Sequence, residues 1–337
     1  MTTFSCTKLM SRPVACACFL ACSFVFGSII EVRAWTPERP IEIVVPSSPG
    51  GSFDKTVRLI ERVARENKLV DVPITVVNKA GGGGNVALAY LQQRPADGHS
   101  IMIVSTALLV NHILGRSPVS HRDLTPTATL FHEYIATIVL TSSSFDTPTA
   151  FTAQLRKAPE TITFGFCCAL GGGNHLAAAM LVKAIGGDVK RMKTVVFKGA
   201  GEVTTAVLGG HITAASNAAS NALGPIQQGQ MKVVAVAAPQ PMAGVLKGVP
   251  TWRDQGLNVV MALTRSLVGP KAMPPDRVQF WEELIHKVVR SAVWREDLER
   301  NVWNDAYKNG ADTSDYLDSQ SHLLITLLGD VGLTQRR

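Results

Sequence analysis

The residues in this sequence that could do chemistry are glycine, serine and asparagine, gathered in short loops. Five apolar or β-branched runs each end in such a loop and then continue in a helical pattern. The loops contain Pro46–Ser52, Gly81–Asn85, Gly171–Asn174, Lys198–Gly201 and Asn217. Glycine lets the main chain approach a ligand closely, and a helix N-terminus presents unpaired N–H groups with partial positive charge. Several such helix ends around one crevice would form a site for an anion.

Strands that alternate with helices in this way predict an α/β architecture of parallel sheets with helices on both faces. The strand-like runs are Ile41–Val45, Ile74–Val77, Ile101–Val104, Thr161–Phe166, Thr194–Phe197, His211–Ser216 and Val233–Ala237. Because parallel strands end at the same edge of a sheet, we expect the loops to line one crevice. Glycine and serine are also common in turns for conformational reasons alone, so a single loop of this kind carries little weight.

Catalytic chemistry has little support in these loops. The acids near them, Asp54 and Glu202, fall in first helical turns, where their interaction with the helix dipole accounts for them. The eight histidines show no metal-ligand spacing, and no lysine follows a glycine loop as in a Walker motif. We therefore expect neither a cofactor nor a metal site, and not an enzyme.

Two enzymatic interpretations remain as the alternative. The segment Gly50–Asp54 resembles the nucleophile elbow of a serine hydrolase, with Ser52 as nucleophile, but it ends in Asp where that motif has Gly. The segment Gly82–Ala87 matches a dinucleotide-binding fingerprint, but the next strand ends without an acid for a ribose hydroxyl. Either interpretation would make the protein an exported α/β enzyme.

The first 34 residues have the order of a secretory signal peptide. Lys8 and Arg12 precede an apolar stretch from Val14 to Ile30, and Val32-Arg33-Ala34 puts short or small residues at the −3 and −1 positions. A retained membrane anchor is the alternative, because the apolar stretch is nearly long enough to span a bilayer. We predict cleavage after Ala34 and a periplasmic mature protein.

The charge balance indicates which classes of partner to expect, and the cysteine positions indicate whether the mature protein contains disulfides. The 33 Lys and Arg residues outnumber the 26 Asp and Glu residues, a balance that favours anionic partners. No basic run interleaved with aromatic residues and no DNA-reading signature is present, so we do not expect nucleic acid. Beyond the predicted signal peptide, Cys167 and Cys168 are adjacent and could pair only through a strained ring. We predict two free, partly buried thiols.

An ordered set of short motifs resembles the periplasmic substrate-binding proteins of tripartite tricarboxylate transporters, the Bug family. The likeness covers nearly all of the predicted mature chain. The motifs are Pro40–Pro46, Pro49–Asp54, Val77–Asn85, Ala96–Gly98, Asp123–Pro126, His175–Ala177, Gly199–Glu202, Val249–Thr251 and Gln255-Gly256. The glycine-rich second loop and Arg265 are more similar to the tricarboxylate branch than to the wider family.

This resemblance implies a two-lobed α/β periplasmic-binding-protein fold of type II, the Venus-flytrap arrangement, with mostly parallel doubly wound sheets and a hinge. Lobe 1 would comprise residues 35–136 and 263–337, and lobe 2 residues 137–262. The implied function is that of a monomeric, non-enzymatic receptor. It would capture a small organic di- or tricarboxylate between the lobes and deliver it to the membrane subunits of a tripartite tricarboxylate transporter.

The resemblance also implies a ligand site built from both lobes. Its residues are Ser48, Gly50, Ser52, Asp54, Gly83, Asn85, Ser105, Thr106, Gly173, Asn174, His175, Lys198, Gly199, Asn217 and Arg265. Three departures from the tricarboxylate branch concern the ligand. Thr264-Arg265-Ser266 stands where Trp-Arg-Gly is usual, Lys198 replaces a small hydroxyl residue, and Cys167-Cys168 replaces a Gly/Ser-rich stretch.

Arg265 lies in the apolar run Val259–Val268, which predicts a buried crossing strand. A guanidinium there needs an acidic partner, and its planar fork suits a ligand carboxylate. An internal salt bridge to an aspartate such as Asp54 or Asp97 is the alternative. For His175 we favour a structural role over contact with the ligand. Lys198 could contact the ligand or point into solvent.

Overall fold

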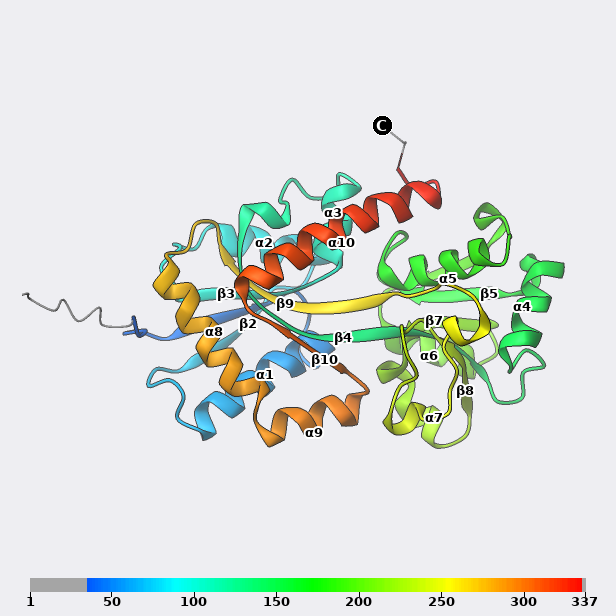
Figure 1. Ribbon diagram of the computed structural model, residues 1–337, viewed down its shortest axis with the longest axis horizontal. Coiled ribbons are helices and arrows are strands. Elements are labelled where there is room, and N and C mark those ends of the chain that lie inside the picture. Colours follow the sequence, from blue (N-terminus) through cyan, green and yellow to red (C-terminus); the bar gives the residue numbers. More distant parts are fainter. Residues whose placement is uncertain (1–34, 335–337) are drawn as a thin grey trace, which may run out of the picture. The chain divides into compact units, whose positions relative to one another are not determined.

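A mixed β-sheet of ten strands runs through the part of the chain that the computed structural model describes, residues 35–334 (Figure 1). The strand order is β2-β1-β3-β9-β4-β7-β5-β6, and β8 and β10 pair with β4 outside this order. The predicted signal peptide and its cleavage site lie outside the described residues.

Three parallel strands, which we call the first strand set, form one end of the sheet. β1 (Ile41–Val45) pairs in parallel with β2 (Ile74–Asn78) and with β3 (Ser100–Ser105). The helices that follow these strands are α1 (Ser52–Glu66), α2 (Asn85–Gln92) and α3 (Ala107–Ile113). The carboxyl ends of the strands therefore lie at one edge, as the sequence predicts.

Three further parallel strands form the second strand set. β5 (Thr163–Cys167) pairs with β6 (Lys193–Phe197) and β7 (Ala214–Ala218), and α5 (Gly173–Ala184) and α6 (Ala200–Leu208) follow the first two. β7 begins three residues later than predicted because the N–H groups of His211 and Ile212 bond to Ala206 and finish α6. The helix expected after β7 is a 3₁₀ turn followed by the short α7 (Leu223–Gln227).

Two long strands join the two sets. β4 (Leu124–Leu140) pairs antiparallel with β9 (Ala262–Pro270), β7, β8 (Met231–Val236) and β10 (Asn304–Lys308), and β9 also pairs antiparallel with β3. The α/β fold is confirmed, but the sheet is mixed, because the strands that carry the chain across and back run in opposite directions. The predicted crossing strand is β9. The lobe boundaries expected from sequence fall within β4 and at the start of β9, and the division itself stays a prediction.

Helices pack on this framework as their apolar spacing requires. α8 (Pro275–Val289) buries Trp281, Leu284, Ile285 and Val288 and contacts α1 and β4, and α9 (Ala292–Asn301) contacts α1 and β10. α4 (Pro148–Lys157) lies beside β8. The long α10 (Gly310–Asp330) contacts β4, α3 and α5 (Figure 1). Within residues 35–334, none of the helices combines the length and apolar character that a membrane crossing demands.

A half-buried histidine on β4, His132, makes the fold sensitive to pH. Burial, assisted by the charge of Lys308, lowers the pKa of His132 from 6.5 to about 4. The unfolded chain takes up this proton near its ordinary pKa, whereas the folded chain takes it up only near the lowered one. The free energy of unfolding therefore falls as the pH drops between these values. Burial lowers the pKa of His175 too, so it acts in the same direction.

We predict that His132→Gln removes part of this dependence. The wild-type protein should lose more stability than the variant between about pH 7 and about pH 5, because only the wild-type has the His132 proton to take up on unfolding. Urea unfolding at the two pH values measures the difference. An equal loss in both proteins would show that His132 does not contribute.

Candidate ligand-binding site

The loops after the first strand set meet beside β9. In the strand register Val45 lies opposite Asn78, and Ser105 lies opposite Arg265 of β9. The side chain of Asn78 donates to the carbonyl of Ser47 at 3.1 Å, which ties the second strand end to the first loop. The three strand ends are therefore neighbours, and Arg265 lies next to the third.

Arg265 is buried and forms an ion pair with the buried Glu133 of β4. Its Nη2 lies 2.5 Å from Oε2 of Glu133 and donates to Oγ of Ser52 at 3.1 Å. The guanidinium also lies over the ring of Phe53, with Cζ 4.5 Å from the ring centroid, in cation–π geometry. An internal salt bridge, one of the two roles considered for Arg265, is thus present, but its partner is a glutamate on the neighbouring strand.

The two aspartates considered as partners of Arg265 pair with other arginines. Asp97 lies 2.6 Å from Arg39. Asp54 accepts hydrogen bonds from Arg58 and from the Gly50 N–H, each at 2.8 Å. Burial raises the pKa of Asp54, but the hydrogen bonds from Arg58, Gly50 and Asn78 together bring it below its ordinary value. Asp54 therefore holds the first loop in place as a carboxylate.

Glu133 connects residues that are far apart in the sequence. Its Oε1 accepts hydrogen bonds from Nε1 of Trp303 at 2.8 Å and from Oγ of Ser220 at 2.7 Å. Ser220 lies in the turn after β7, whereas Ser52 begins α1, so the ion pair is bonded to both strand sets. Sequence analysis did not identify Glu133, Ser220 or Trp303 as site residues. The signal for Glu133 was an acid directly after His132 in a mostly apolar run.

The loop after β5 approaches the same ion pair. The positive charge of Arg265 lowers the pKa of Cys168 in this loop. A Cβ on Gly173 would lie 2.6 Å from Cδ2 of Leu263 on β9, so the start of α5 packs directly against that leucine side chain. From the first strand set, Arg116 donates to a main-chain carbonyl of the loop at 3.1 Å. Loops of both strand sets therefore meet around β9.

Four of the helices that begin at these loops have uncapped N-termini. Their N-cap residues are Gly51 for α1, Gly84 for α2, Gly172 for α5 and Gly199 for α6, and none provides a side-chain cap. By contrast, side chains cap α4, α9 and α10, from Thr147, Ser291 and Asn309 respectively. Free first-turn N–H groups combined with the positive end of the helix dipole suit an anion.

The residues expected at the site differ in exposure. Ser48, Gly50, Gly83 and Lys198 are exposed, and Ser52, Asn85, Ser105 and Gly199 are half-buried. Asp54, Thr106, Gly173, Asn174, His175, Asn217 and Arg265 are buried. The first two groups are accessible to a solute, and the third lies beneath them. Whether each residue touches a ligand stays a prediction.

Several buried members of this set bond to the protein itself. Nδ1 of His175 accepts the Gly171 N–H at 3.1 Å, in keeping with the structural role favoured from sequence. Oδ1 of Asn217 accepts the Ala218 N–H at 3.0 Å, and the Thr106 hydroxyl donates to the Ala262 carbonyl at 3.4 Å. These contacts hold the loops in place. The exposed and half-buried residues of the same set are therefore the better candidates for ligand contact.

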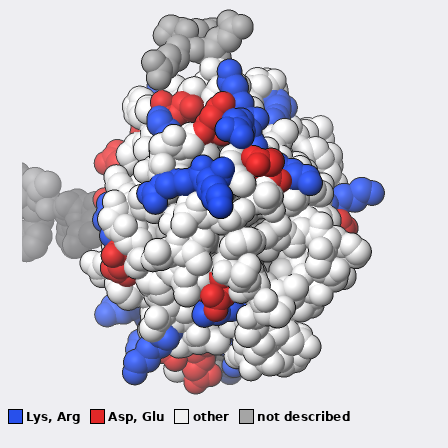
Figure 2. Space-filling model, turned by 90° about the vertical axis from the view of Figure 1, so that its right-hand side faces the viewer, with Lys and Arg blue, Asp and Glu red and all other residues white. Residues whose placement is uncertain are grey.

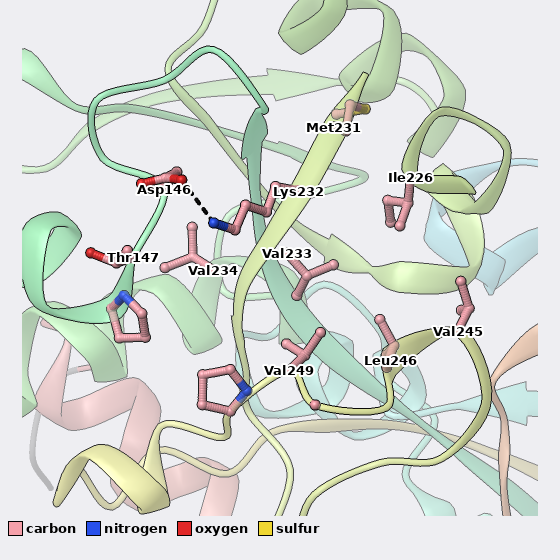
Figure 3. Close-up of a pocket in the computed structure, with 13 residues that line it drawn as sticks. Asp146, Thr147, Ile226, Met231, Lys232, Val233, Val234, Val245, Leu246 and Val249 are labelled. Atoms are coloured by element: carbon pink, nitrogen blue, oxygen red, sulfur yellow. Dashed lines mark hydrogen bonds and ion pairs between the residues drawn. The ribbon is translucent and has the colours of Figure 1, made fainter. Parts of the chain in front are cut away.

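A cavity of about 380 Å³ lies away from these loops, between β8, the start of α4 and residues 245–250 (Figure 3). Valine, leucine, isoleucine and proline dominate its lining. The amine of Lys232 lies 2.7 Å from the carboxylate of Asp146, as the dashed line in Figure 3 shows. An apolar lining and a neutralised lysine do not suit a carboxylate, and none of the expected ligand residues lines this cavity.

Surface charge does not mark a binding site on the face that Figure 2 shows. Basic and acidic side chains are interspersed there, and much of the surface is uncharged. The excess of Lys and Arg is thus not gathered into one uninterrupted basic patch on this face. The uncapped helix N-termini at the loops around Arg265 are stronger evidence for an anion site than the surface charge.

Two parallel strand sets, crossing antiparallel strands and glycine-rich loops at the strand ends make up the α/β fold of periplasmic binding proteins. The sequence model of a protein family, the tripartite tricarboxylate transporter family receptor, matches residues 58–333. The chain therefore belongs to that family. Members of this family are solute-binding receptors and not enzymes. The expectation of a non-enzymatic receptor is confirmed at this level.

Relatives and solved structures agree with this family. Protein BugT of Bordetella pertussis is 24% identical over 260 residues, which cover 76% of this chain and 78% of BugT. A TctC solute binding protein from Polaromonas is 25% identical with a TM-score of 0.71, covering 87% of this chain and 99% of that chain. Two Rhodopseudomonas palustris proteins have the same fold. One, solved with adipate, has a TM-score of 0.75, 20% identity and coverage of 88% and 98%. The other, MatC with bound malate, has a TM-score of 0.72 and 19% identity, and the match covers 87% of this chain and 99% of MatC.

The geometry explains why the two enzymatic motifs were misleading. The Ser52 hydroxyl is hydrogen-bonded to Arg265, whereas His286 and His322, the late histidines of the chain, are exposed on α8 and α10. The apparent dinucleotide fingerprint starts as a 3₁₀ turn, Gly82–Gly84, whose three glycines all have positive φ. It is a turn that only glycine adopts readily.

We predict that separating the buried ion pair destabilises the fold. Arg265→Met leaves the Glu133 carboxylate buried without its cation, and losing one partner of such a pair costs about 3–5 kcal/mol. The double variant Arg265→Met/Glu133→Gln should recover part of this loss, because the amide keeps an oxygen for Trp303 and Ser220. Free energies of unfolding in urea measure both effects.

The matched control is Arg65→Met, which removes an exposed arginine 2.8 Å from Glu61 on α1. An exposed pair contributes less than about 1 kcal/mol. A loss in Arg265→Met no larger than in this control would contradict a structural role for the buried pair.

Proposed function

We propose that this protein is an exported receptor that captures a small organic di- or tricarboxylate and delivers it to the membrane subunits of a tripartite tricarboxylate transporter. The observation that carries the proposal is a set of uncapped helices that begin after glycine: α1 and α5 at loops around the Arg265–Glu133 pair, and α6, whose Ala200 carbonyl accepts a hydrogen bond from Asn217 of β7 at 3.5 Å. The ligand would lie between lobe 1, residues 35–136 and 263–337, and lobe 2, residues 137–262.

Main-chain donors supply most of the attraction in this proposal. Glu133 already neutralises Arg265, so the buried guanidinium offers little net charge to a ligand. Each helix N-terminus contributes about 0.3–1 kcal/mol, and up to about 2 kcal/mol where it is partly buried. Hydrogen bonds to a charged group contribute about 1.5–3 kcal/mol each. A few of these suffice for micromolar affinity, about −8 kcal/mol, after the cost of ordering.

Arg265 acts on the ligand through Ser52 in this scheme. The oxygen of Ser52 accepts a hydrogen bond from Nη2 of Arg265 at 3.1 Å. Because a hydroxyl has one hydrogen to donate, that hydrogen then points away from the guanidinium. Ser52 lies in the first turn of α1, so its hydroxyl and the nearby N–H groups can bind one carboxylate together.

The class of ligand follows from this donor set and from the family. Two or more carboxylates on a small molecule can engage helix ends from both strand sets at once, which a monocarboxylate cannot. The relatives solved with adipate and with malate each hold a dicarboxylic acid, which supports the same class here. Family membership and the signal-peptide pattern support a periplasmic receptor that works with a transporter, and we propose that it is a monomer.

A thermal-shift screen of di- and tricarboxylates tests the proposed function directly. A ligand at about 100 times its dissociation constant should raise the free energy of unfolding by about 2.7 kcal/mol. Malate, adipate and citrate are the first probes. If none of the di- and tricarboxylates stabilised the protein, or if a fluorophosphonate labelled Ser52 covalently, the proposal would be contradicted.

We further predict that Gly199→Asp weakens binding of the ligand found in that screen by about tenfold or more. Gly199 has extended φ and ψ, and a Cβ placed there has nothing within 4 Å, so aspartate fits without strain. Its carboxylate would cap α6, occupy the N–H groups and repel the ligand. The free energy of unfolding should stay the same or rise by about a few tenths of a kcal/mol, because glycine is itself a tolerated N-cap residue. Isothermal titration calorimetry and urea unfolding measure the two effects.

Two matched variants separate this effect from charge alone. Asn309→Asp adds the same charge at the N-cap of α10, which already has a side-chain cap, and should leave affinity unchanged. Gly199→Ser caps α6 with a neutral hydroxyl and should weaken binding less than aspartate does. Unchanged affinity in Gly199→Asp, or an equal loss in Asn309→Asp, would remove α6 from the site.

A further inference from the structure

Two adjacent thiols lie at the carboxyl end of β5, directly before the loop that begins α5. Cys167 and Cys168 are both free, and their sulfur atoms lie 2.6 Å apart. Cys167 is half-buried and Cys168 is exposed, so the prediction of two free thiols is confirmed and the expected partial burial holds for Cys167 only. Neither thiol has a role in the proposed capture of a carboxylate.

The backbone explains how the two sulfur atoms meet. Neighbouring side chains in a strand normally point to opposite faces of the sheet. Cys168 breaks this alternation because its φ is 83°, in the left-handed region that side chains other than glycine rarely adopt. A hydrogen bond from the Cys168 N–H to the Phe197 carbonyl at 2.9 Å holds this conformation. The fold thus brings two nucleophilic atoms together at an accessible place.

The surroundings make the two thiols unequal. The hydrogen bond with Cys167 lowers the pKa of Cys168, burial opposes this, and the positive charge of Arg265 lowers it further. The same hydrogen bond, together with burial, raises the pKa of Cys167. Nδ2 of Asn174 also donates to Cys167 Sγ at 3.4 Å. Reactive cysteines are accessible and have a lowered pKa, and both features distinguish Cys168 as the nucleophile.

We propose that Cys167 and Cys168 form a reversible two-electron redox site that reacts with disulfide oxidants. The Cys168 thiolate attacks one sulfur of oxidised glutathione, the glutathione S–S bond breaks, and a glutathione thiolate leaves. Cys167 then loses its proton to solvent and attacks Sγ of Cys168, which expels the glutathione bound there as a second thiolate. The dithiol becomes a disulfide, and two protonated glutathiones carry away the two electrons and two protons.

The product would be a labile disulfide. Adjacent cysteines close a strained ring, and strain makes a disulfide easier to reduce. Such a bond forms and breaks according to the thiol–disulfide balance of its surroundings, unlike a structural disulfide. The proposal depends only on the geometry of the two thiols, so it stands or falls separately from the carboxylate function.

Mass mapping after trypsin digestion tests this redox site on the full chain. The peptide of residues 158–183 contains both thiols and no other cysteine, so it reports on this pair alone. With oxidised glutathione, the wild-type peptide should become lighter by two hydrogen atoms, and dithiothreitol should reverse the change. Cys167→Ser should stop at one bound glutathione on Cys168. Cys168→Ser should react with oxidised glutathione at least about tenfold more slowly than Cys167→Ser does.

Three results would overturn the inference. They are a wild-type peptide that retains bound glutathione without closing, equal rates in the two single variants, and cross-links between two copies of the chain in place of the internal disulfide. Circular dichroism of each variant, compared with the wild-type spectrum, confirms that the variants are folded when they react.

Discussion

The ion pair between Arg265 and Glu133 is the constraint around which the other parts of the candidate site are arranged. Each charge is buried, and removing an ion from water costs several kcal/mol, so the pair persists only with further hydrogen bonds. Ser52 accepts from the arginine, and Ser220 and Trp303 donate to the glutamate. One carboxylate and one guanidinium thereby fix the start of α1, the turn after β7 and the segment before β10 relative to one another.

This arrangement changes how a buried arginine is understood in a protein that binds anions. An arginine in an apolar strand suggests a direct salt bridge to the ligand, but here the protein supplies the carboxylate itself. Anion recognition then passes to helix N-termini, where the N-cap residue provides no side-chain hydrogen bond to the first-turn N–H groups. Capping differs between the helices: those at the candidate site begin after glycine, whereas α4, α9 and α10 begin with a capping side chain and α8 begins after Pro274 without one.

The vicinal thiols lie in the same neighbourhood and share its electrostatics. Arg265 acts on both the anion site and Cys168, although Glu133 offsets much of its charge. Cys168 also departs from ordinary strand geometry, and such conformations persist only where the surrounding contacts enforce them. The loop that starts α5 is therefore both a candidate contact for a carboxylate and the neighbour of the proposed redox site.

The sequence by itself determined the α/β class, most strand positions, the glycine-rich loops at strand ends and the buried crossing strand. These follow from local patterns, since apolar periodicity and turn residues act over a few neighbouring positions. Only the tertiary structure decided that Glu133 is the partner of Arg265, that Ser220 and Trp303 join it, and that β4 makes the sheet mixed. Those contacts link residues more than 80 positions apart. Which of several acids meets a buried arginine depends on strand register and crossing, which no local pattern records.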